Sequence, residues 1–503
     1  MPNPLHDRLF GRHETSDAPF LIHPGGDVTT YAAFVAEAAR IAAVLLERGL
    51  EPGDRLAAQV EKSPQALALY AACARVGVVF LPLNTGYTTD ELTYFVQDSG
   101  ARMLVCDPAR AEALAPLAAG QDAALETLDA DGGGSLMDAA AGAGAAPVIE
   151  RGSDDLAAFL YTSGTTGRSK GAMLTQGNLL SNAETLAKHW RFIAEDRLIH
   201  ALPIFHTHGL FVATNVTLTA GGALVFLPKF DIDAILAAMP GATTMMGVPT
   251  FYTRLLSDDR FTRGVAGGMR LFVSGSAPLL TETHREFEAR TGHRILERYG
   301  MTETNMNTSN PYDGERRPGA VGFPLPGVEL KIIDPASGDT LPDGAVGQIE
   351  VRGPNVFKGY WRMPEKTAEE LRADGFFITG DLGRIDEDGY VHIVGRNKDL
   401  IISGGYNIYP KEIEVLLDEA PGVLESAVIG VPHPDFGETV VGVLVPKPGE
   451  TPDTDAVAES IAGSLARFKQ PRRLVVVDEL PRNTMGKVQK NVLRERYAGL
   501  FAQ

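Results

Sequence analysis

The sequence predicts an α/β protein with two unequal domains, and three observations support this fold class. The 503 residues suffice for two or three domains with buried cores. Strand-like apolar runs alternate with helix-like amphipathic stretches over most of the chain, as in α/β architecture. From about Pro342 the pattern changes to short strands and turns. We therefore expect a large N-terminal α/β domain of packed sheets and helices, followed by a smaller α+β domain.

Three segments of the first 150 residues have distinct patterns. Apolar residues from Thr29 to Leu50 recur at the spacing of an amphipathic helix. The apolar run from Arg75 to Leu83 is short and is typical of a buried strand. Residues 131–147 are rich in glycine and alanine, and we expect them to form a flexible surface connection with no regular element.

The C-terminal part of the sequence also divides into elements. Asp386–Gly389 has the sequence DEDG between two strand-like runs, which predicts a hairpin turn. Helices are expected near Pro410–Leu417 and near Asp455–Leu465. The stretch GRNKDLIISGG separates these two parts, and we place a domain boundary within Gly395–Lys398. The predicted domains are therefore residues 1–396 and residues 397–503.

Composition and charge exclude several classes of protein. Apolar residues make up 44%, and no uninterrupted apolar stretch approaches the ~20 residues that span a bilayer. The formal net charge of −18 makes the chain a poor general ligand for nucleic acid, whose binding depends on neutralising phosphates. Cys73 and Cys106 are too few for a disulfide framework, and Asp7 interrupts any signal-peptide core. We expect a cytoplasmic protein that binds neither nucleic acid nor membrane.

One region is basic within this acidic chain. From Arg467 to Arg496 there are nine Lys and Arg residues against three Asp and Glu. Such a run is usually a solvated helix face. The alternative is a surface that meets the phosphates of a small anionic ligand.

The strongest local motif is a loop with the sequence YTSGTTGRSKG, from Tyr161 to Gly171. It follows the apolar run LAAFL, so we expect it to leave a strand. Its glycines allow a close backbone approach, and its hydroxyls and Lys170 supply donors for phosphate oxygens. It is not a Walker A loop, in which Gly-Lys is followed directly by Ser or Thr. Such a loop is often only a turn, but its length and terminal Lys-Gly favour phosphate binding.

This loop resembles the phosphate-binding signature of the adenylate-forming (ANL) superfamily, which contains acyl-CoA synthetases, nonribosomal-peptide adenylation domains and luciferases. Further motifs of that superfamily recur in order over about residues 20–500, namely HTHG from His206, SGSAP from Ser274, YGMTE from Tyr299, TGDL from Thr379, GR at Gly395, SGGYN from Ser403 and PRNTMGK from Pro481. The resemblance implies an ANL-like fold, in which the smaller C-terminal domain is mobile.

The resemblance assigns residues to an ATP site. Asp381 would accept hydrogen bonds from both ribose hydroxyls with help from Arg396, although a buried Asp could equally cap a turn. Glu303 would hold Mg²⁺. The catalytic residues would be Lys487, Thr302, Glu303 and His206. The nucleotide-binding residues would be Thr162, Ser163, Gly164, Thr165, Thr166, Gly167, Lys170, Ser276, Ala277, Glu297, Arg298, Tyr299, Gly300, Met301, Thr302, Asp381 and Arg396.

The expected reaction follows from charge. Attack of a carboxylate on the α-phosphorus of ATP needs no general base, because the carboxylate is already an anion. It needs two anions brought together and charge stabilised on the phosphoryl oxygens. Lys487, Thr302 and magnesium would supply that stabilisation. An exposed surface lysine is the ordinary alternative for Lys487, and its basic surroundings and the family motif argue against it.

The resemblance also implies a second step, in which a thiol attacks the adenylate. Lys398 occupies the family's hinge position, about which the small domain reorients. The coenzyme A-binding residues in the second orientation would be Ser403, Gly404, Gly405 and Tyr406.

The acid depends on individual residues. The segments containing HTHG, SGSAP and YGMTE resemble malonyl-CoA synthetases, which use malonate and often methylmalonate. Carried onto this chain, the resemblance makes Arg285 the ligand of the distal carboxylate. Helical periodicity turns Arg285 away from Leu280 and Phe287, so a plain surface arginine is the alternative. The expected substrate-binding residues are Arg285, His206, Thr207, Ser276 and Met306.

We therefore expect an AMP-forming acid–thiol ligase that makes malonyl-CoA from malonate, ATP and coenzyme A. One alternative is a ligase for another small, medium-chain or aromatic acid, and another is an adenylating enzyme that loads a carrier protein. Acetylation of Lys487 would remove the catalytic charge, which makes a lysine acetyltransferase and a deacetylase candidate partners. His206 and His208 do not predict zinc, because no third His or Cys follows at ligand spacing.

Overall fold

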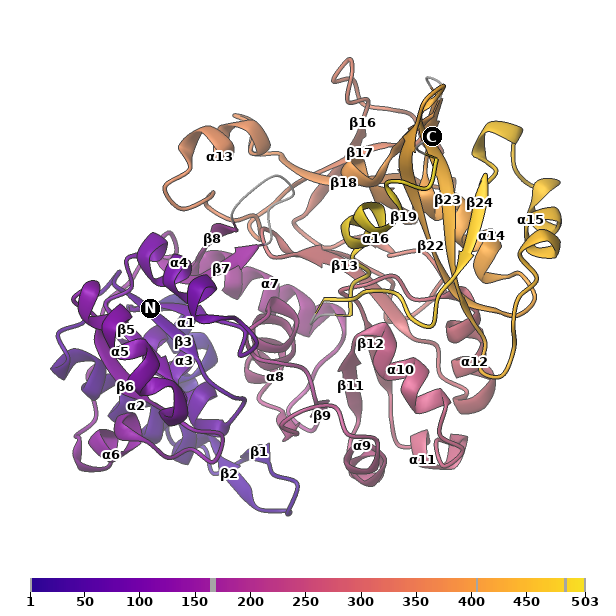
Figure 1. Ribbon diagram of the computed structural model, residues 1–503. Coiled ribbons are helices and arrows are strands. Elements are labelled where there is room, and N and C mark those ends of the chain that lie inside the picture. Colours follow the sequence, from indigo (N-terminus) through magenta and orange to yellow (C-terminus); the bar gives the residue numbers. More distant parts are fainter. Residues whose placement is uncertain (1, 163–168, 404–405, 484–485, 502–503) are drawn as a thin grey trace.

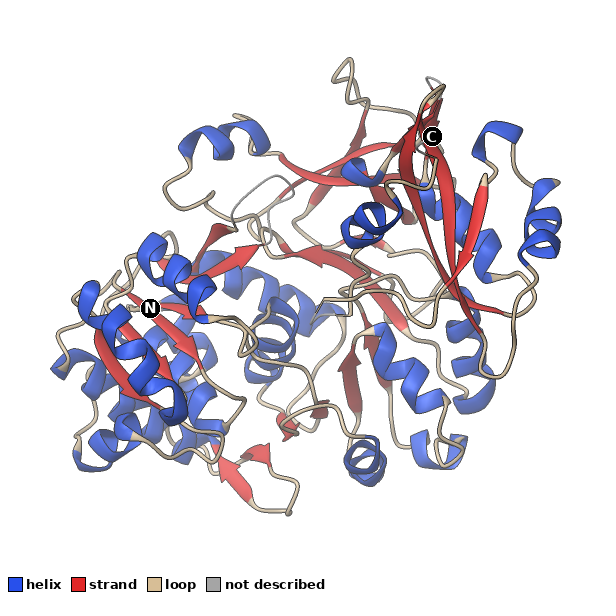
Figure 2. Ribbon diagram, in the orientation of Figure 1, coloured by secondary structure: helices blue, strands red, loops and turns tan. Residues whose placement is uncertain are grey.

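The computed structural model describes residues 2–162, 169–403, 406–483 and 486–501, which form four β-sheets with helices packed on them (Figure 1). Two mainly parallel sheets make up the N-terminal body, and two smaller sheets follow along the chain (Figure 2). Helices cover both large sheets, so their strands are buried on both faces. The predicted α/β class, with a large N-terminal part and a smaller C-terminal part, is confirmed.

The first sheet has six strands in the order β6-β5-β3-β4-β7-β8, all parallel except for the antiparallel pair β7-β8. Its strands are β3 (Arg55–Gln59), β4 (Val79–Pro82), β5 (Met103–Cys106), β6 (Ala124–Thr127), β7 (Leu156–Thr162) and β8 (Lys170–Thr175). Every residue of β4 and β5 is buried, as their unbroken apolar sequences predict. The strand expected within Arg75–Leu83 is β4.

Local signals fix the helices around this sheet. The helix α3 (Pro64–Val76) begins with a side-chain cap from Ser63 and ends at Gly77, whose φ of 71° suits glycine. The helix expected within Thr29–Leu50 is α2 (Tyr31–Glu47). The other helices of this part are α1 (Pro4–Leu9), α4 (Thr89–Ser99), α5 (Ala111–Gly120), α6 (Ser135–Gly142) and α7 (Gln176–His189).

The expectation for residues 131–147 was wrong, because α6 lies within them. Leu136 and Ala140, one helical turn apart, are buried, and α6 packs against α2. Gly134 precedes the helix with a φ of 118°, which requires glycine, so the glycines belong to the turn that starts the helix. Tertiary packing stabilises a segment whose composition resembles a linker.

The second sheet has nine strands in the order β15-β14-β13-β12-β11-β9-β10-β1-β2, with a parallel centre from β13 to β1. Its strands are β1 (Pro19–Ile22), β2 (Val28–Thr30), β9 (Arg197–His200), β10 (Ala223–Phe226), β11 (Thr244–Gly247), β12 (Leu271–Ser274), β13 (Leu296–Met301), β14 (Asn305–Ser309) and β15 (Phe323–Pro324). Its helices are α8 (Asn215–Ala220), α9 (Ile232–Ala238), α10 (Pro249–Leu256), α11 (Arg263–Ala266) and α12 (Thr281–Thr291). A π-helix spans His208–Thr214. Loops at the carboxyl ends of such parallel strands commonly form ligand sites.

The third sheet is antiparallel, in the order β16-β17-β18-β19, with α13 (Pro364–Glu370) beside it. Its strands are β16 (Glu329–Ile333), β17 (Gly347–Arg352), β18 (Phe377–Ile385) and β19 (Val391–Arg396). The predicted hairpin turn at Asp386–Gly389 joins β18 to β19 and is confirmed.

The fourth sheet begins only a few residues after Arg396, so the expected domain boundary falls between two sheets. Its strands are β20 (Ile401–Ser403), β21 (Tyr406–Ile408), β22 (Val423–His433), β23 (Gly437–Pro446) and β24 (Arg473–Val476). The two helices expected in this part are α14 (Pro410–Asp418) and α15 (Thr454–Ala462), and α16 (Lys490–Tyr497) follows. In Figure 1 this part stands beside α10 and α12 of the body.

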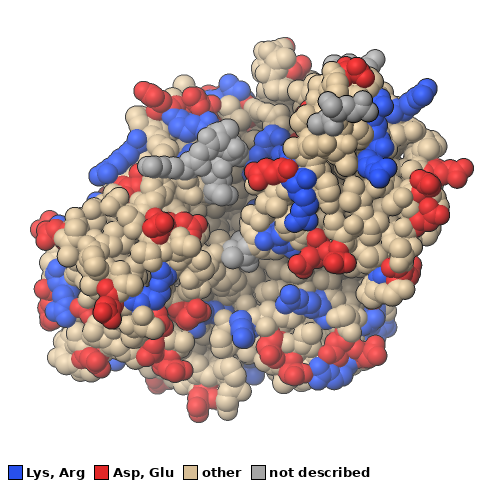
Figure 3. Space-filling view, in the orientation of Figure 1, with Lys and Arg blue, Asp and Glu red and all other residues tan. Residues whose placement is uncertain are grey.

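Charges of both signs are interspersed on the face seen in Figure 3. In the basic stretch from Arg467 to Arg496, several cations pair with local carboxylates, namely Lys469 with Glu412, Arg482 with Glu425, Lys490 with Glu414 and Arg494 with Asp399. Much of this stretch is therefore neutralised within the C-terminal part. None of the helices in the described ranges combines the length and the hydrophobicity that a bilayer crossing requires.

Candidate active site

The phosphate loop leaves one sheet edge as predicted. Thr162 ends β7 and pairs with Lys170, the first residue of β8. The Lys170 ammonium lies 3.2 Å from the Glu370 carboxylate and 4.1 Å from the centre of the Tyr360 ring. The intervening predicted residues, Ser163, Gly164, Thr165, Thr166 and Gly167, lie outside the described residues.

Two carboxylates compete for one hydroxyl beside this loop. The Tyr360 hydroxyl lies 2.6 Å from Glu370 and 3.1 Å from Glu303. Glu303 is buried, and burial raises the pKa of its carboxyl. One hydroxyl proton cannot satisfy both carboxylates, so the buried Glu303 has capacity for a cation. The residues present fit a magnesium ion, which is usually held by one or two carboxylates together with substrate phosphates.

Asp381 is held on β18 by three groups. Arg396 faces it on β19 and places its Nε 2.9 Å from the carboxylate. The Tyr299 hydroxyl donates to the other carboxylate oxygen at 2.5 Å. The Asp381 amide donates to the Thr379 hydroxyl at 3.1 Å. The sequence predicted Asp381, Arg396 and Tyr299 for the nucleotide site, and the structure brings these three together.

Lys487 reaches this group from the C-terminal part. Its amide donates to the Asn483 side chain at 2.9 Å, which closes the loop that carries it, and Gly486 lies beside Thr250 of α10. Desolvation, and then the positive charge of Arg396, lower the pKa of the Lys487 ammonium to about 8, against the opposing pull of Asp381. Lys487 is therefore mainly charged at neutral pH and lies among the predicted site residues.

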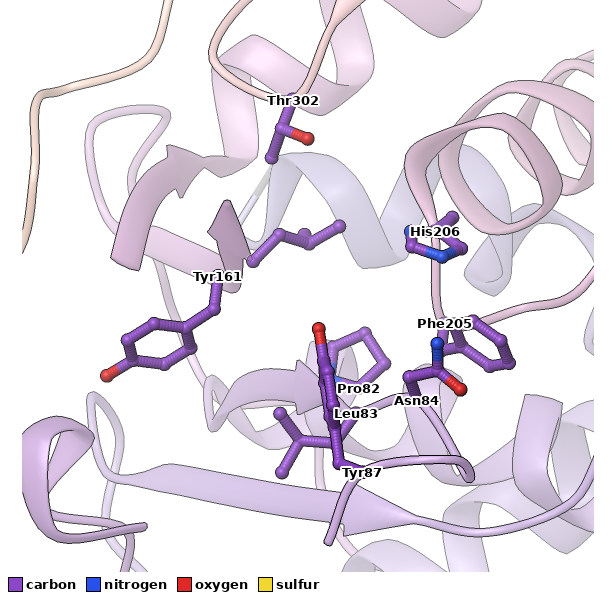
Figure 4. A pocket seen from close by; sticks show the side chains of 9 residues that line it. Pro82, Leu83, Asn84, Tyr87, Tyr161, Phe205, His206 and Thr302 are labelled. Carbon is purple, nitrogen blue, oxygen red and sulfur yellow. The ribbon is translucent and has the colours of Figure 1, made fainter. Parts of the chain in front are cut away.

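His206 and Thr302 line a common pocket (Figure 4). Phe205 and Tyr161 line it as well, together with the loop after β4 that contains Tyr87. Burial, and then the charge of Lys487, lower the pKa of His206 to about 4, so its ring is neutral at pH 7. His206 can therefore donate or accept one hydrogen bond without adding charge.

A set of buried polar atoms lies next to His206 with no hydrogen-bond partner within the described residues, and it comprises His206 Nε2, Thr207 Oγ1, His208 Nε2, Ser274 Oγ, and Nε and Nη2 of Arg298. Buried polar groups are normally paired, because leaving one unpaired is costly. The chain thus presents an arginine, three hydroxyl or imidazole groups and His206 with hydrogen-bonding capacity left over.

Arg298 is the centre of this set. Its side chain is 4% exposed, and burial lowers the pKa of the guanidinium to about 9. The guanidinium packs on Gly275, where a Cβ would come within 2.4 Å of it. Burial, and then the charge of Arg298, lower the pKa of His208, whose Nδ1 lies 3.3 Å from the Ser276 hydroxyl. Strands β12 and β13 pair Ser274 with Glu297, the residue before Arg298.

The structure does not bring Arg285 to this set. Arg285 is exposed on α12, and it makes no hydrogen bond or ion pair in the part of the chain that the structure describes. The neighbouring His284 is the buried residue of that helix and lies 3.5 Å from Glu297. Arg285 is thus exposed, as helical periodicity indicates, and its expected role as carboxylate ligand stays a prediction.

The remaining predicted residues divide by location. Met306 and Glu297 are buried in β14 and β13, while Ala277, Gly300 and Met301 are partly exposed nearby. Lys398 is exposed between the third and fourth sheets, and Ser403 is buried at the end of β20. Gly404 and Gly405 lie outside the described residues, and of Tyr406 only its place in β21 is described.

Sequence reasoning missed four contributors, namely Ser274, His208, Tyr360 and Glu370. The first two stand inside quoted motifs, so their neighbours could have indicated them. Tyr360 and Glu370 carry no local signal, because only the fold brings them to Lys170 and Glu303.

Comparison with known proteins agrees with this geometry. The model of the AMP-binding enzyme family matches residues 11–361, and that of the AMP-binding enzyme C-terminal domain matches residues 412–487. A malonate–CoA ligase of Arabidopsis thaliana is 37% identical over 83% of this chain and 74% of its own length. A feruloyl-CoA synthase of an Amycolatopsis species is 37% identical over 95% of each chain.

The ATP-bound structure of MatB from Rhodopseudomonas palustris is 61% identical over 100% of both chains, with a TM-score of 0.98. The apo structure of MatB from the same organism, with the same identity and coverage, gives a TM-score of 0.87. Because the sequence is equally similar in both cases, the difference is one of conformation. The arrangement described here is closer to the ATP-bound one.

Proposed function

Because the chain belongs to the AMP-binding enzyme family, we propose that it joins malonate to coenzyme A through a malonyl-adenylate, with release of AMP and pyrophosphate. The paired matches to both family models and the similarity to a malonate–CoA ligase support this reaction. The assignment of malonate as the acid depends on the buried polar residues of the site, above all on Arg298.

The observation that carries the assignment is Arg298, a buried arginine whose Nε and Nη2 have no hydrogen-bond partner among the described residues. A buried cation without an anion is costly, and a planar guanidinium fits a carboxylate in a two-pronged pair. An acid with a second carboxylate would pair with Arg298. A fatty acid or a plain aromatic acid would leave this arginine unpaired.

Arg298 therefore takes the role that the sequence suggested for Arg285. The distal carboxylate would sit on Arg298, and the reacting carboxylate would point toward Lys487 and Thr302. Met306 and Thr207 would then flank the carbon between the two carboxylates. A side chain on that carbon, as in methylmalonate, would be accepted or rejected by these two residues.

The protein's part in adenylation is to hold two anions together. Asp381, oriented by Arg396 and Tyr299, would accept the ribose hydroxyls. Lys487 and Thr302 would stabilise charge on the phosphoryl oxygens. Glu303 would hold a magnesium ion, which supplies further neutralisation of phosphate charge when it is bound. His206 stays neutral and shields the reacting carboxylate from water.

Thiol attack would use another orientation of the C-terminal domain, residues 397–503. Lys398 would be the hinge, and rotation would withdraw Lys487 and present Ser403 and the following residues to coenzyme A. The lower TM-score against the apo MatB structure supports a change of domain arrangement along the cycle.

The test is ATP- and CoA-dependent product formation with malonate, methylmalonate, acetate and octanoate side by side, with AMP and thioester both quantified. Malonate is expected to have the highest kcat/KM. A lead for octanoate or acetate would overturn the acid assignment and leave the ligase chemistry standing. Adenylate formation without thioester from free CoA would instead indicate a carrier-protein acceptor.

A further inference from the structure

A half-buried lysine in the loop after β3 of the first sheet packs against the second sheet. Lys62 lies between β3 and α3, and its ammonium lies 2.8 Å from His200 Nδ1, 2.8 Å from the His200 carbonyl and 2.6 Å from the Leu227 carbonyl. It also lies 4.4 Å from the centre of the Phe226 ring. No carboxylate pairs with it within the described ranges. All three N–H groups are therefore committed to the ends of β9 and β10.

The Gly209 carbonyl fixes the tautomer of His200. A carbonyl oxygen can only accept, so the ring proton must stand on Nε2, which lies 2.9 Å from the Gly209 carbonyl. Burial lowers the pKa of His200 well below its ordinary value, so the ring is neutral and its bare Nδ1 accepts from Lys62. The Thr214 hydroxyl donates to the same carbonyl at 3.0 Å. Two hydrogen bonds thus connect Lys62 through the His200 ring to the Gly209 carbonyl.

The segment held by these hydrogen bonds contains the groups that are expected to bind the acid. Residues 201–208 run from the end of β9 to the start of the π-helix, and they include His206, Thr207 and His208 with their unpaired atoms. The backbone at Gly209 packs closely against the Pro203 carbonyl, because a Cβ at this position would lie only 2.0 Å from that oxygen. Only glycine fits here, and the segment folds back on itself at this point. π-helical turns often occur at functional sites, where they displace side chains from α-helical register.

We propose that Lys62 and His200 form a positioning pair that sets the histidine segment, residues 201–208, at the distance from Arg298 that the acid requires. The pair touches neither substrate, and it acts through the Gly209 carbonyl. This inference rests on the proposed function only in naming malonate as the acid. If the wild-type enzyme prefers another acid, the proposed function fails, and the pair is tested with the preferred acid.

The first test is Lys62→Met, which keeps the side-chain volume and removes the three donors. A displaced segment is expected to raise the KM for malonate about 10- to 100-fold, by analogy with other small displacements of positioned groups. The KM for ATP is expected to stay unchanged, because the groups around Asp381 do not touch this segment. An equal rise in both KM values, or no rise in either, would overturn the proposal.

The matched control is Tyr70→Phe. The Tyr70 hydroxyl accepts from the Asn215 side chain at 3.2 Å, so it also joins the first sheet's α3 to the second sheet's α8 in a buried contact. This variant is expected to lower the melting temperature without changing the KM for malonate. A rise in the malonate KM equal to that of Lys62→Met would show that both contacts act through stability alone and would overturn the positioning role.

Two further measurements keep the proposal testable if Lys62→Met does not fold. In the wild-type enzyme, ¹⁵N-histidine NMR is expected to show His200 with Nε2 protonated and Nδ1 bare, and the opposite tautomer would overturn the proposal. Thr214→Val removes the second donor to the Gly209 carbonyl, and it is expected to raise the malonate KM by less than Lys62→Met. An unchanged KM would mean that this carbonyl does not position the segment.

Discussion

Arg298 and Lys487 are two cations of one site that are presented in opposite ways. Arg298 stands on a central strand, is locked over Gly275 and is 4% exposed. Lys487 stands on a loop of the C-terminal part, closed by Asn483, and enters from outside the body. Desolvation is the main cause of the lowered pKa in both, to about 9 for Arg298 and to about 8 for Lys487.

This difference suits two roles, because a fixed arginine can select the acid while a lysine on a separate domain supplies charge for adenylation. In the proposed cycle, Arg298 would keep its place in both orientations of the C-terminal domain, and recognition of the acid would persist through both half-reactions. Lys487 would be in place only in the arrangement described here, which resembles the ATP-bound relative more than the apo one. A charge needed for adenylation alone can thus be supplied and withdrawn, while the charge that chooses the acid stays fixed.

The largest expected effect is on Lys487→Ala. Loss of its charge should slow adenylate formation about 10³-fold, as loss of a preorganised donor does elsewhere. Thioester formation from supplied malonyl-adenylate should be spared, because thiol attack needs no stabilisation of phosphoryl charge. Pyrophosphate exchange measures the first step and thioester release the second. Equal loss of both would contradict the separation, and stoichiometric acetylation of Lys487 should reproduce the Ala variant.

Arg298→Met should change which acid is used. A hydrogen-bonded charged group contributes about 1.5–3 kcal/mol, so the ratio of kcat/KM for malonate to that for acetate should fall about 10- to 100-fold. Arg285→Met is the matched control, since it removes an exposed arginine of the adjacent helix and should leave the ratio unchanged. A loss of malonate use in the control alone would restore the assignment made from the sequence.

The pH profile gives a smaller and graded effect. Lys487 is charged below its pKa of about 8 and neutral above it, so charge stabilisation is present at low pH and lost as the pH rises. The kcat/KM for ATP in the adenylation step should therefore fall about tenfold per unit above about pH 8. The Lys487→Arg variant keeps its charge at these pH values. Its kcat/KM for ATP should therefore be lower than that of the wild-type enzyme but constant over this range. The same decline in that variant would exclude Lys487 as its source.

The smallest effect is expected at the surface contact between the two parts of the chain. Lys447 lies 3.5 Å from Glu282, and both side chains are well exposed. Exposed pairs contribute at most about 1 kcal/mol and weaken with salt. Lys447→Ala should hardly change adenylation and should shift the melting temperature little. A strong effect that disappears at high salt would show that this pair holds the domains in their present arrangement.

The fold could be predicted where the pattern was local. Hydrophobic periodicity located α2, and an unbroken apolar run located β4. The helix α6 could not be predicted, because its stability comes from Leu136 and Ala140 packing on a distant helix while its composition resembles a linker.

The site could be predicted where motifs carry it. Asp381, Arg396 and Tyr299 meet as expected, although they come from different strands. The choice between two arginines could not be made, because burial and the lack of partners depend on the fold. Helical periodicity did indicate that Arg285 is exposed, whereas its role as carboxylate ligand stays a prediction from the resemblance. The pairing of Lys62 with His200 has no local signal, since 138 residues separate them.

We propose that Arg298 selects the acid and that Lys487 supplies the charge for adenylation. The most direct test is pyrophosphate exchange with malonate and with acetate for the wild-type enzyme, Arg298→Met and Lys487→Ala. Lys487→Ala is expected to lower both rates and leave their ratio unchanged, whereas Arg298→Met is expected to lower the ratio. A changed ratio in Lys487→Ala, or an unchanged ratio in Arg298→Met, would show that the two cations do not have these separate roles.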